Sequence, residues 1–449
     1  MKHALKLFAV LAVLASAAFA QVNIKYDSYT LPNGLKVILH EDRSVPLVAV
    51  NIWYHVGSAN EKAGRTGFAH LFEHMLFQGS QNVGDDQHFG LIQEAGGSLN
   101  GSTSNDRTNY FQTVPSQFLE MVLWLESDRM GFLLPAMTQG KLDNQRDVVK
   151  NERRQRVDNQ PYGRAFERIH ALLYDPSHPY SWPVIGSMED LSAASLDDVK
   201  EFFQTYYVPN NSALVIAGDF DAKKTKEWVE KYFGDLPKGK PVTQLSSPPP
   251  SLRGEKRDLM EDRVQLPRLY LAWHTPAFFA PDDAELDVLA DVLTGGKNSR
   301  LYKTLVYDKQ IAQSVVASQI SRKLSGMFMI QVTAKPGYTL SELEKVVDEE
   351  IEKLKKEAPA DREVLRSKNS TKASFIYRIQ SIDNKADQMN SYNFYWGDPG
   401  AFNKDLERYQ KVTPADIQRV VQKYLTKNRV VFSVVPLGKK ELAAQPSVN

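Results

Sequence analysis

The sequence predicts an α+β protein made of two homologous halves, and two observations support this prediction. The pattern of residues 195–220, a helical segment followed by a strand-like one, recurs in residues 413–438 at a shift of 218 residues. Between the two occurrences lies a stretch rich in proline, serine and lysine, which has the composition of an extended linker. Because a repeat this long is typical of two duplicated domains, we predict an N-terminal domain at 21–233, a linker at 234–254 and a C-terminal domain at 255–449.

The first 20 residues have the composition of a secretory signal peptide. Lys2 and Lys6 precede an apolar run, and Ala18 and Ala20 are the small residues that a signal peptidase recognises. The sequence therefore predicts a signal peptide at 1–20 and a periplasmic mature protein. A leader that is retained as a membrane anchor is the alternative.

The composition excludes several classes of function. Of the 449 residues, 42% are hydrophobic and 24% are charged, which are ordinary values for a globular protein. The formal net charge of +1 becomes −1 without the leader, which holds two lysines and no acid, so no basic surplus favours nucleic acid. The absence of cysteine excludes disulfides and a lipoprotein anchor. No later apolar run reaches the roughly 20 residues that cross a bilayer, so no membrane span is expected in the mature protein.

The first half begins with two strand-like segments. Residues 29–40 alternate around Pro32-Asn33-Gly34, a turn signal that joins two extended stretches. Residues 45–55 are rich in valine, isoleucine and aromatic residues, which favour a strand. A mainly buried helix is expected next, over 67–79.

A hairpin and two helices follow. Residues 87–95 are helical and end at Gly96-Gly97, a helix stop. The polar segment 98–103 and the alternating segment 108–114 are expected to pair at an edge of a sheet. Helical patterning returns over 116–128.

The predicted helix over 67–79 carries the residues that indicate a chemistry. His70 and His74 are four residues apart and so project from one face of a helix, where both imidazoles can reach one metal ion. Two neutral imidazoles suit zinc, and the carboxylate of Glu73 beside them can take a proton from metal-bound water. The alternative is a helix whose two histidines only form hydrogen bonds. The apolar flanks favour the metal, because unpaired polar groups on a buried helix are costly.

A third metal ligand is expected on residues 141–157, a charged segment without proline or glycine that predicts a long, mostly exposed helix. On this helix Glu152 shares a face with Gln145, Val148 and Val149. A carboxylate on the semi-apolar stripe of a charged helix is a candidate ligand. A glutamate that is only solvated is the alternative.

The second half serves as an internal control for this site. At the shift of the repeat, the positions that match the helical motif fall within 287–293, and the match to Glu152 falls near Ser370. No histidine or glutamate stands at the matching positions. The sequence therefore predicts one metal site, and one zinc ion, per chain.

The order His70, Glu73, His74, with Glu152 a further 78 residues on, resembles the pitrilysin/insulinase family of zinc peptidases, whose zinc motif is inverted. The resemblance covers nearly all of the mature chain. It extends through three further segments: Asn100-Gly101, Asn159-Gln160-Pro161-Tyr162-Gly163, and Gly295-Gly296 with Ser299-Arg300-Leu301.

The resemblance implies a fold and a mechanism. Family members of this size consist of two similar halves, each a mixed β-sheet backed by helices, and the halves enclose a chamber in which peptides are cut. It implies that His70, His74 and Glu152 hold zinc, and that Glu73 activates the water that attacks a peptide carbonyl. The edge strand to which the substrate backbone adds as a further strand corresponds to Leu99, Asn100, Gly101, Ser102 and Thr103, and Tyr162 is a further candidate for substrate contact.

Two departures from the family pattern bear on activity. Gln145 stands where members usually carry a second glutamate. In the second half, Val306 and Gln313 stand where active single-chain members have an arginine and a tyrosine that reach across to the substrate. The pattern resembles the catalytic subunit of two-chain members. We therefore expect a heterodimer with a related subunit that supplies this arginine and tyrosine, and a homodimer is the alternative.

Two other functions stay open at the level of sequence. One is a non-catalytic structural or assembly subunit, because the family includes inactive members that serve as assembly cores. The other is a dedicated processing enzyme that acts on one precursor, in contrast to an endopeptidase that cuts peptides or unfolded segments in general.

Overall fold

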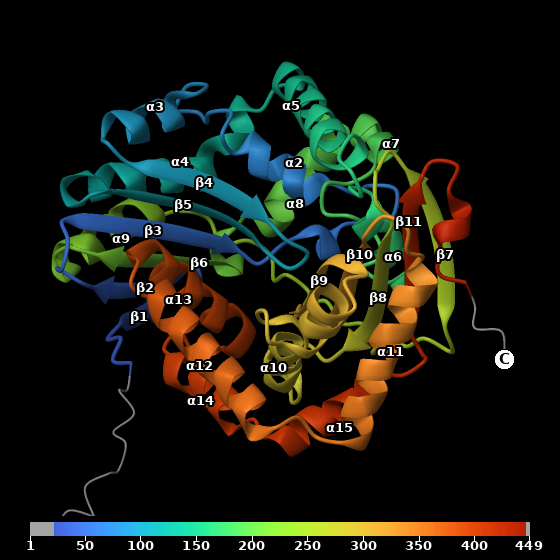
Figure 1. Cartoon of the computed structure of the whole chain (residues 1–449). Helices are drawn as coiled ribbons and strands as arrows, with labels where there is room; N and C mark the ends of the chain where they lie inside the picture. Colours follow the sequence, from blue (N-terminus) through green and yellow to red (C-terminus); the bar gives the residue numbers. More distant parts are fainter. Residues whose placement is uncertain (1–21, 446–449) are drawn as a thin grey trace, which may run out of the picture.

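The computed structural model describes residues 22–445, and it consists of two β-sheets with helices packed around them (Figure 1). The predicted signal peptide, 1–20, lies outside the described residues. Within 22–445, no helix combines the length and the apolar composition needed to cross a membrane.

The first sheet has six strands in the order β1-β2-β6-β3-β5-β4. β2 and β6 run parallel and the other neighbours are antiparallel, so the sheet is mixed. The turn predicted before β2 is present, and Gly34 has a φ of +95°, a left-handed conformation that glycine tolerates. The strands are β1 Asp27–Thr30, β2 Lys36–Glu41, β3 Leu47–Tyr54, β4 Ser98–Thr103, β5 Thr108–Pro115 and β6 Ser212–Gly218.

The second sheet repeats this order without a counterpart of β1. Its order is β7-β11-β8-β10-β9, which matches β2-β6-β3-β5-β4 strand for strand, and β7 and β11 are parallel as β2 and β6 are. The agreement confirms the predicted fold class, an α+β protein of two homologous halves that each contain a mixed sheet backed by helices. The strands are β7 Lys256–Asp262, β8 Arg268–Thr275, β9 Ala312–Ile320, β10 Gly326–Ala334 and β11 Val430–Pro436.

Helices of the first half cover one face of the first sheet. Leu214 and Ile216 of β6 pack with residues of α2, α4, α8 and α9 in one core. Because successive residues of a strand face opposite sides, the intervening Val215 and Ala217 face a different core. The helices are α2 Phe68–Met75, α3 Gln87–Glu94, α4 Leu119–Ala136, α5 Gln139–Arg153, α6 Ala165–Leu173, α7 Met188–Ala193, α8 Leu196–Tyr206 and α9 Ala222–Phe233, with short turns η1 Ser58–Asn60, η2 Ser116–Phe118, η3 Arg154–Asp158 and η4 Pro209–Asn211.

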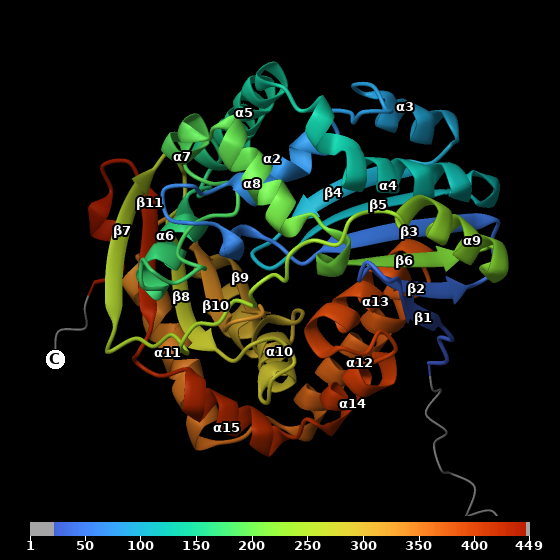
Figure 2. The same ribbon diagram turned by 180° about the vertical axis from the view of Figure 1, so that it is seen from behind.

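The two halves exchange one helix each. The second face of the first sheet is covered by α13 of the second half, where Ala386 and Met389 pack on β6 residues Val215 and Ala217. In return, α6 of the first half packs on the second sheet through Ile169, against side chains of β8, β10 and β11. Figures 1 and 2 show both placements from opposite sides. The helices of the second half are α10 Asp283–Thr294, α11 Leu340–Lys356, α12 Asp361–Arg378, α13 Ile382–Trp396, α14 Phe402–Lys411 and α15 Pro414–Tyr424, with turns η5 Tyr302–Asp308 and η6 Lys440–Leu442.

The predicted linker, 234–254, carries neither helix nor strand and connects α9 to β7. The domain boundaries at 21–233 and 255–449 stay a prediction, because the exchanged helices make the packing units differ from the sequence halves. One predicted helix is longer than expected, since 116–128 lies within η2 and α4, which extends to Ala136. The predicted helix over 141–157 corresponds to α5 and the wider π-helical turn η3.

Candidate metal centre

Helix α2 is fixed at its N-terminus by a buried carboxylate. Glu61 accepts hydrogen bonds from the backbone N–H groups of Gly67 (3.0 Å) and Ala69 (2.8 Å), which have no partners within the helix. A Cβ at Gly67 would crowd the backbone at Ile185 and Gly186, so the chain approaches closely there. The start of α2 is therefore held by contacts within the first half.

The two faces of α2 have different surroundings. Leu71, Phe72 and Met75 are buried in the first core. His70 and His74, on another face, line a cavity of about 350 Å³. The amphipathic spacing of the motif thus places apolar side chains in the core and polar ones at the cavity, as a helical period requires.

Glu152 on α5 completes a cluster with the two histidines. Val149, three residues earlier, is buried in the same core as α2 and holds this part of α5 against it. The Nε2 atoms of His70 and His74 lie 3.7 Å and 3.2 Å from Oε2 of Glu152. All three potential ligand atoms lie within 4.8 Å of one another, and within residues 22–445 this is the one group of three or more such side chains that could hold a metal ion.

The donor set fits a zinc ion. The ligand atoms of a tetrahedral zinc lie about 3.3 Å apart, because each lies about 2.0–2.2 Å from the metal. Burial, together with the neighbouring His74, lowers the pKa of His70 to about 4, so its imidazole is neutral and able to ligate. The hydrogen bond from His74 lowers the pKa of Glu152, which is therefore ionised. Both side chains have the protonation state that a metal ligand needs.

Glu73 is held in place by β4. The hydroxyl of Thr103 donates a hydrogen bond of 2.6 Å to Oε2 of Glu73. A Cβ at Gly101 would lie 3.0 Å from Cγ of Glu73, so glycine lets the strand approach the carboxylate closely. Burial raises the pKa of Glu73. The carboxylate thus lies beside the cluster in the same cavity, with one oxygen fixed by the protein.

The predicted substrate-binding segment forms β4, an edge strand. Within the described chain β4 pairs with β5 alone. Asn100 and Gly101 line the cavity, and Thr103 contacts Glu73. Leu99 packs against the first core, and the hydroxyl of Ser102 bonds Asn109 of β5, so these two side chains point to other surroundings.

Tyr162 lies apart from this cavity, which is lined by His70, Glu73, His74, Phe77, Gln78, Phe89, Asn100, Gly101, Gln145, Glu152 and Arg156. The side chain of Tyr162 instead contacts the second half, where its hydroxyl donates to the backbone oxygen of Leu266. The structure therefore brings together the three predicted ligands, the predicted base and part of the edge strand, but not Tyr162.

Two side chains at the site were missed by the sequence analysis. Arg156 pairs with Oε1 of Glu152 at 2.7 Å, and its spacing of four residues on a helix is a signal that points to such a contact. The bond from Thr103 to Glu73 has no signal in sequence, because it depends on where β4 lies relative to α2. Gln145 is buried and lines the cavity, as expected for the residue that replaces a second glutamate.

In the second half, the positions that match the ligands lie within the core. Val288 and Val292 of α10 are fully buried there, and Ser370 on α12 is exposed. Val306 packs against the same core from η5, and Gln313 is exposed on β9. These side chains offer no metal ligand and no guanidinium or phenol.

Two halves with matching mixed sheets, and a single histidine–histidine–glutamate cluster with an adjacent carboxylate, define a protein of the zinc metalloprotease class. Residues 36–181 match the model of the insulinase family, peptidase family M16, and residues 193–371 match the model of the peptidase M16 inactive domain. The chain belongs to the insulinase family of peptidases, M16, and the predicted resemblance is confirmed.

Individual proteins are similar over nearly the whole chain. The zinc protease PqqE of Helicobacter pylori is 31% identical, and the match covers 96% of this chain and 98% of that protein. A probable mitochondrial-processing peptidase subunit beta of Arabidopsis thaliana is 24% identical, with 90% of this chain and 77% of that protein covered. The crystal structure of a protease from Helicobacter pylori superposes with a TM-score of 0.87 at 29% identity, covering 92% of this chain and all of that one.

Proposed function

We propose that this chain is a zinc-dependent endopeptidase in which His70, His74 and Glu152 hold one zinc ion. The observation that carries the proposal is the convergence of their three ligand atoms within 4.8 Å, in a cavity that also contains Glu73. Zinc bound there would polarise a peptide carbonyl and lower the pKa of a water molecule.

Glu73 acts as the general base in this proposal. Its pKa is raised by burial, which suits a group that takes a proton from water and passes it to the leaving amine near neutral pH. Thr103 occupies one oxygen of the carboxylate, so the other oxygen is left for the proton transfer. The side chain is thereby oriented without being a ligand.

The substrate backbone is proposed to add to β4 as a further strand. The free edge of residues 98–103 supplies backbone hydrogen-bonding groups beside Glu73, and the cavity next to it is lined by Phe77 and Phe89. Because such binding is made to main-chain groups, selectivity for sequence is expected to be loose, and peptides or unfolded segments are the proposed substrates. The two halves are proposed to enclose the chamber in which cleavage takes place.

The metal half is proposed to work with a partner. Val306 and Gln313 cannot supply the arginine and tyrosine that are expected to hold a substrate, so we propose a heterodimer with a related subunit that carries both, with a homodimer as the alternative. One relative is itself named as a subunit of a processing peptidase. Full peptidase activity of the isolated chain, measured against the mixture with a candidate partner, would refute this part of the proposal.

The proposed location is the periplasm, on the basis of the predicted leader at 1–20. Sequencing the N-terminus of the protein purified from a periplasmic fraction tests it. A first residue of Gln21 is expected, and an intact leader in the membrane fraction would contradict the proposal.

The decisive test is Glu73→Gln combined with metal analysis. The expected result is about one equivalent of retained zinc with peptide hydrolysis lost by at least about 1,000-fold, because the ligands stay while the base is removed. Glu94→Gln, an exposed position at the end of α3, serves as the control and should leave both quantities unchanged. Unchanged hydrolysis by Glu73→Gln would remove the mechanism.

A non-catalytic structural subunit is the second candidate function. It is favoured by one observation, that residues 193–371 match the model of an inactive domain. The zinc content of carefully purified protein separates the two functions, since less than about half an equivalent would favour the structural one.

A further inference from the structure

The segment that joins α5 to α6 is tightly folded. Tyr162 has a φ of +62°, a left-handed conformation that costs a non-glycine residue about 1 kcal/mol or more. A Cβ at the next residue, Gly163, would collide with the backbone oxygen of Val157 in the π-helical turn η3. A conformation of this kind persists only where surrounding contacts hold it.

The contacts that hold Tyr162 come from the second half. Its backbone N–H donates to Oδ2 of Asp262 (2.8 Å), at the end of β7, and its hydroxyl donates to the backbone oxygen of Leu266 (2.7 Å). The guanidinium of Arg268, at the start of β8, lies 3.6 Å from the centre of its ring. The connection between β7 and β8 therefore grips this one residue of the first half.

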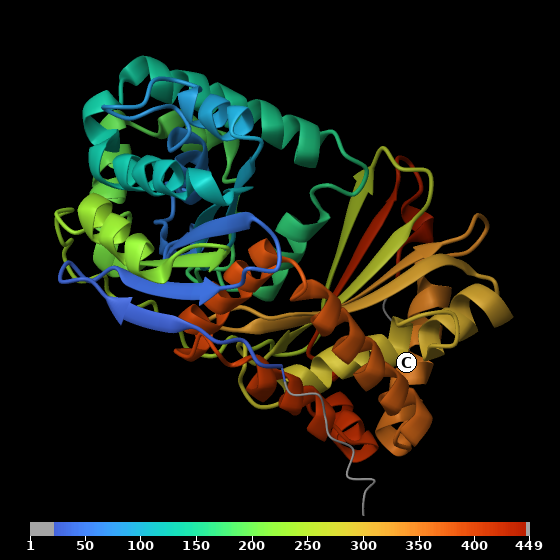
Figure 3. The same ribbon diagram turned by 90° about the vertical axis from the view of Figure 1, so that its left-hand side faces the viewer.

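A second connection starts one residue after the proposed ligand Glu152. Arg153 forms a two-bond pair with Glu167 of α6, with Nη–Oε distances of 2.6 Å and 2.9 Å, and also donates to the backbone oxygen of Gly186. α6 itself is packed on the second sheet. Figure 3 shows α5 and the segment after it reaching from the first half toward the strands of the second before the chain turns back into α6.

The proposed ligands therefore have different supports. α2, with His70 and His74, is fixed by Glu61 and by the first core, both within the first half. The helix that carries Glu152 is fixed at its C-terminal end by Tyr162 and by the pair Arg153–Glu167, which lead to the second sheet.

We propose that Tyr162 and the Arg153–Glu167 pair are positioning residues for Glu152, so that the second half, which offers no ligand, sets the zinc affinity of the first. This inference rests on the proposed zinc site. It assigns Tyr162 a role different from the substrate contact expected from sequence.

The test measures the zinc dissociation constant of full-length variants by competition with a chromophoric chelator. Tyr162→Ala and Glu167→Gln are expected to bind zinc about 10- to 100-fold more weakly, the usual effect of removing an outer partner of a metal ligand. Tyr162→Phe keeps the ring over which Arg268 lies and should lose less. Amide hydrogen exchange over 145–158 in metal-free protein should be faster in Tyr162→Ala and Glu167→Gln, and Glu167→Gln carries the test if Tyr162→Ala does not fold.

Asn390→Ala is the matched control. Asn390 of α13 donates a buried hydrogen bond of 2.9 Å to the backbone oxygen of Asn51, so the variant weakens the same interface between the halves without touching α5 or α6. It should lose thermal stability and keep the zinc affinity of the wild type. Affinities within about twofold of wild type in Tyr162→Ala and Glu167→Gln, or an equal loss in Asn390→Ala, would overturn the inference alone. A wild-type protein that binds no zinc would overturn it together with the proposed function.

Discussion

Helices α2 and α10 occupy the same place in the two halves, and only α2 presents a metal-binding face. Where α2 has His70 and His74 at a cavity, α10 has Val288 and Val292, which are fully buried in the second core. The same pair of packed helices thus supports a polar cavity in one half and a filled apolar core in the other. The difference teaches that duplication preserved the scaffold, and that the chemistry depends on a few side chains on one face.

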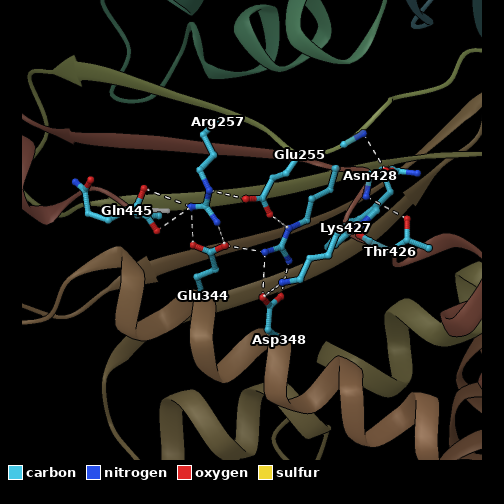
Figure 4. Close-up of polar contacts among 12 residues, drawn as sticks. Glu255, Arg257, Glu344, Asp348, Thr426, Lys427, Asn428 and Gln445 are labelled. Carbon is cyan, nitrogen blue, oxygen red and sulfur yellow. Dashed lines mark hydrogen bonds and ion pairs between the residues drawn. The ribbon is translucent and has the colours of Figure 1, made fainter. Parts of the chain in front are cut away.

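The halves also use their charged residues differently. In the second half the side chain of Arg429 is almost fully buried and contacts Glu255, Glu344 and Asp348, and Arg257 shares two of these partners (Figure 4). These charges satisfy one another. At the cavity of the first half, by contrast, the buried Nδ1 atom of His70 has no hydrogen-bond partner. Closed networks stabilise, whereas open valences are what a binding site needs.

The largest expected effect comes from exchanging a matched pair of positions. His74→Ala should abolish stoichiometric zinc binding and lower kcat/KM by about 1,000-fold or more, because a ligand is lost. Val292→Ala, at the equivalent position, should keep both quantities but lower the free energy of unfolding by about 2 kcal/mol through lost burial. Metal analysis, peptide hydrolysis and urea unfolding check this. One equivalent of zinc in His74→Ala would contradict it.

Removing Arg429 should destabilise the protein and leave its zinc content unchanged. Arg429→Ala leaves three carboxylates without their shared partner, and breaking a buried pair costs about 3–5 kcal/mol. Arg43→Ala breaks an exposed ion pair with Glu41 in the first half and should cost less than about 1 kcal/mol. Urea unfolding compares the two variants, and similar losses would refute the distinction.

A smaller effect is expected at Thr103. Thr103→Val keeps the shape of the side chain and removes the hydrogen bond to Glu73. Zinc binding and KM should stay unchanged while kcat falls by about tenfold, the equivalent of about 1.4 kcal/mol. A fall in zinc content would show that the bond serves the metal cluster and not the base.

The smallest effect concerns the pH dependence of the second half. Burial, with Asp283 nearby, raises the pKa of Asp287 on α10 to about 7. Ionising this carboxyl in the folded protein is unfavourable, so its contribution to stability is present below about pH 4 and is lost as the pH rises toward 7. Asp287→Asn should therefore unfold at a higher temperature than wild type at pH 8, by about 1 kcal/mol in free energy, and match it at pH 4. A difference that does not change with pH would contradict the assignment.

Local spacing allowed much of the fold and part of the site to be predicted. The histidines and Glu73 lie within one helical turn of each other, so their geometry follows from the α-helix, and the repeat gave the correspondence of β6 with β11. Glu152 was proposed from its place on the face of a helix, and the structure brings it to the histidines. These features depend on short-range periodicity or on a direct comparison of two stretches of sequence.

Other features depend on how distant segments pack. The hydrogen bond of Thr103, the contacts of Tyr162 and the exchange of α6 and α13 each require the relative placement of elements that sequence periodicity does not encode. The repeat shows that α6 and α13 are equivalent, but it does not tell which sheet each helix covers. For Tyr162 the sequence analysis predicted a contact with substrate, and the structure places its side chain against the second half.

The exchange of helices has a consequence for the order in which the chain folds. The side of β6 that bears Val215 and Ala217 is covered by α13, so it stays open until the segment 382–396 has been synthesised and has docked. A nascent first half therefore exposes an apolar sheet face for most of the time of its synthesis, and sequestration by a chaperone would protect it from aggregation. Since the second sheet needs α6 in the same way, neither half is a separate folding unit, and both cores close together in one late, non-local step.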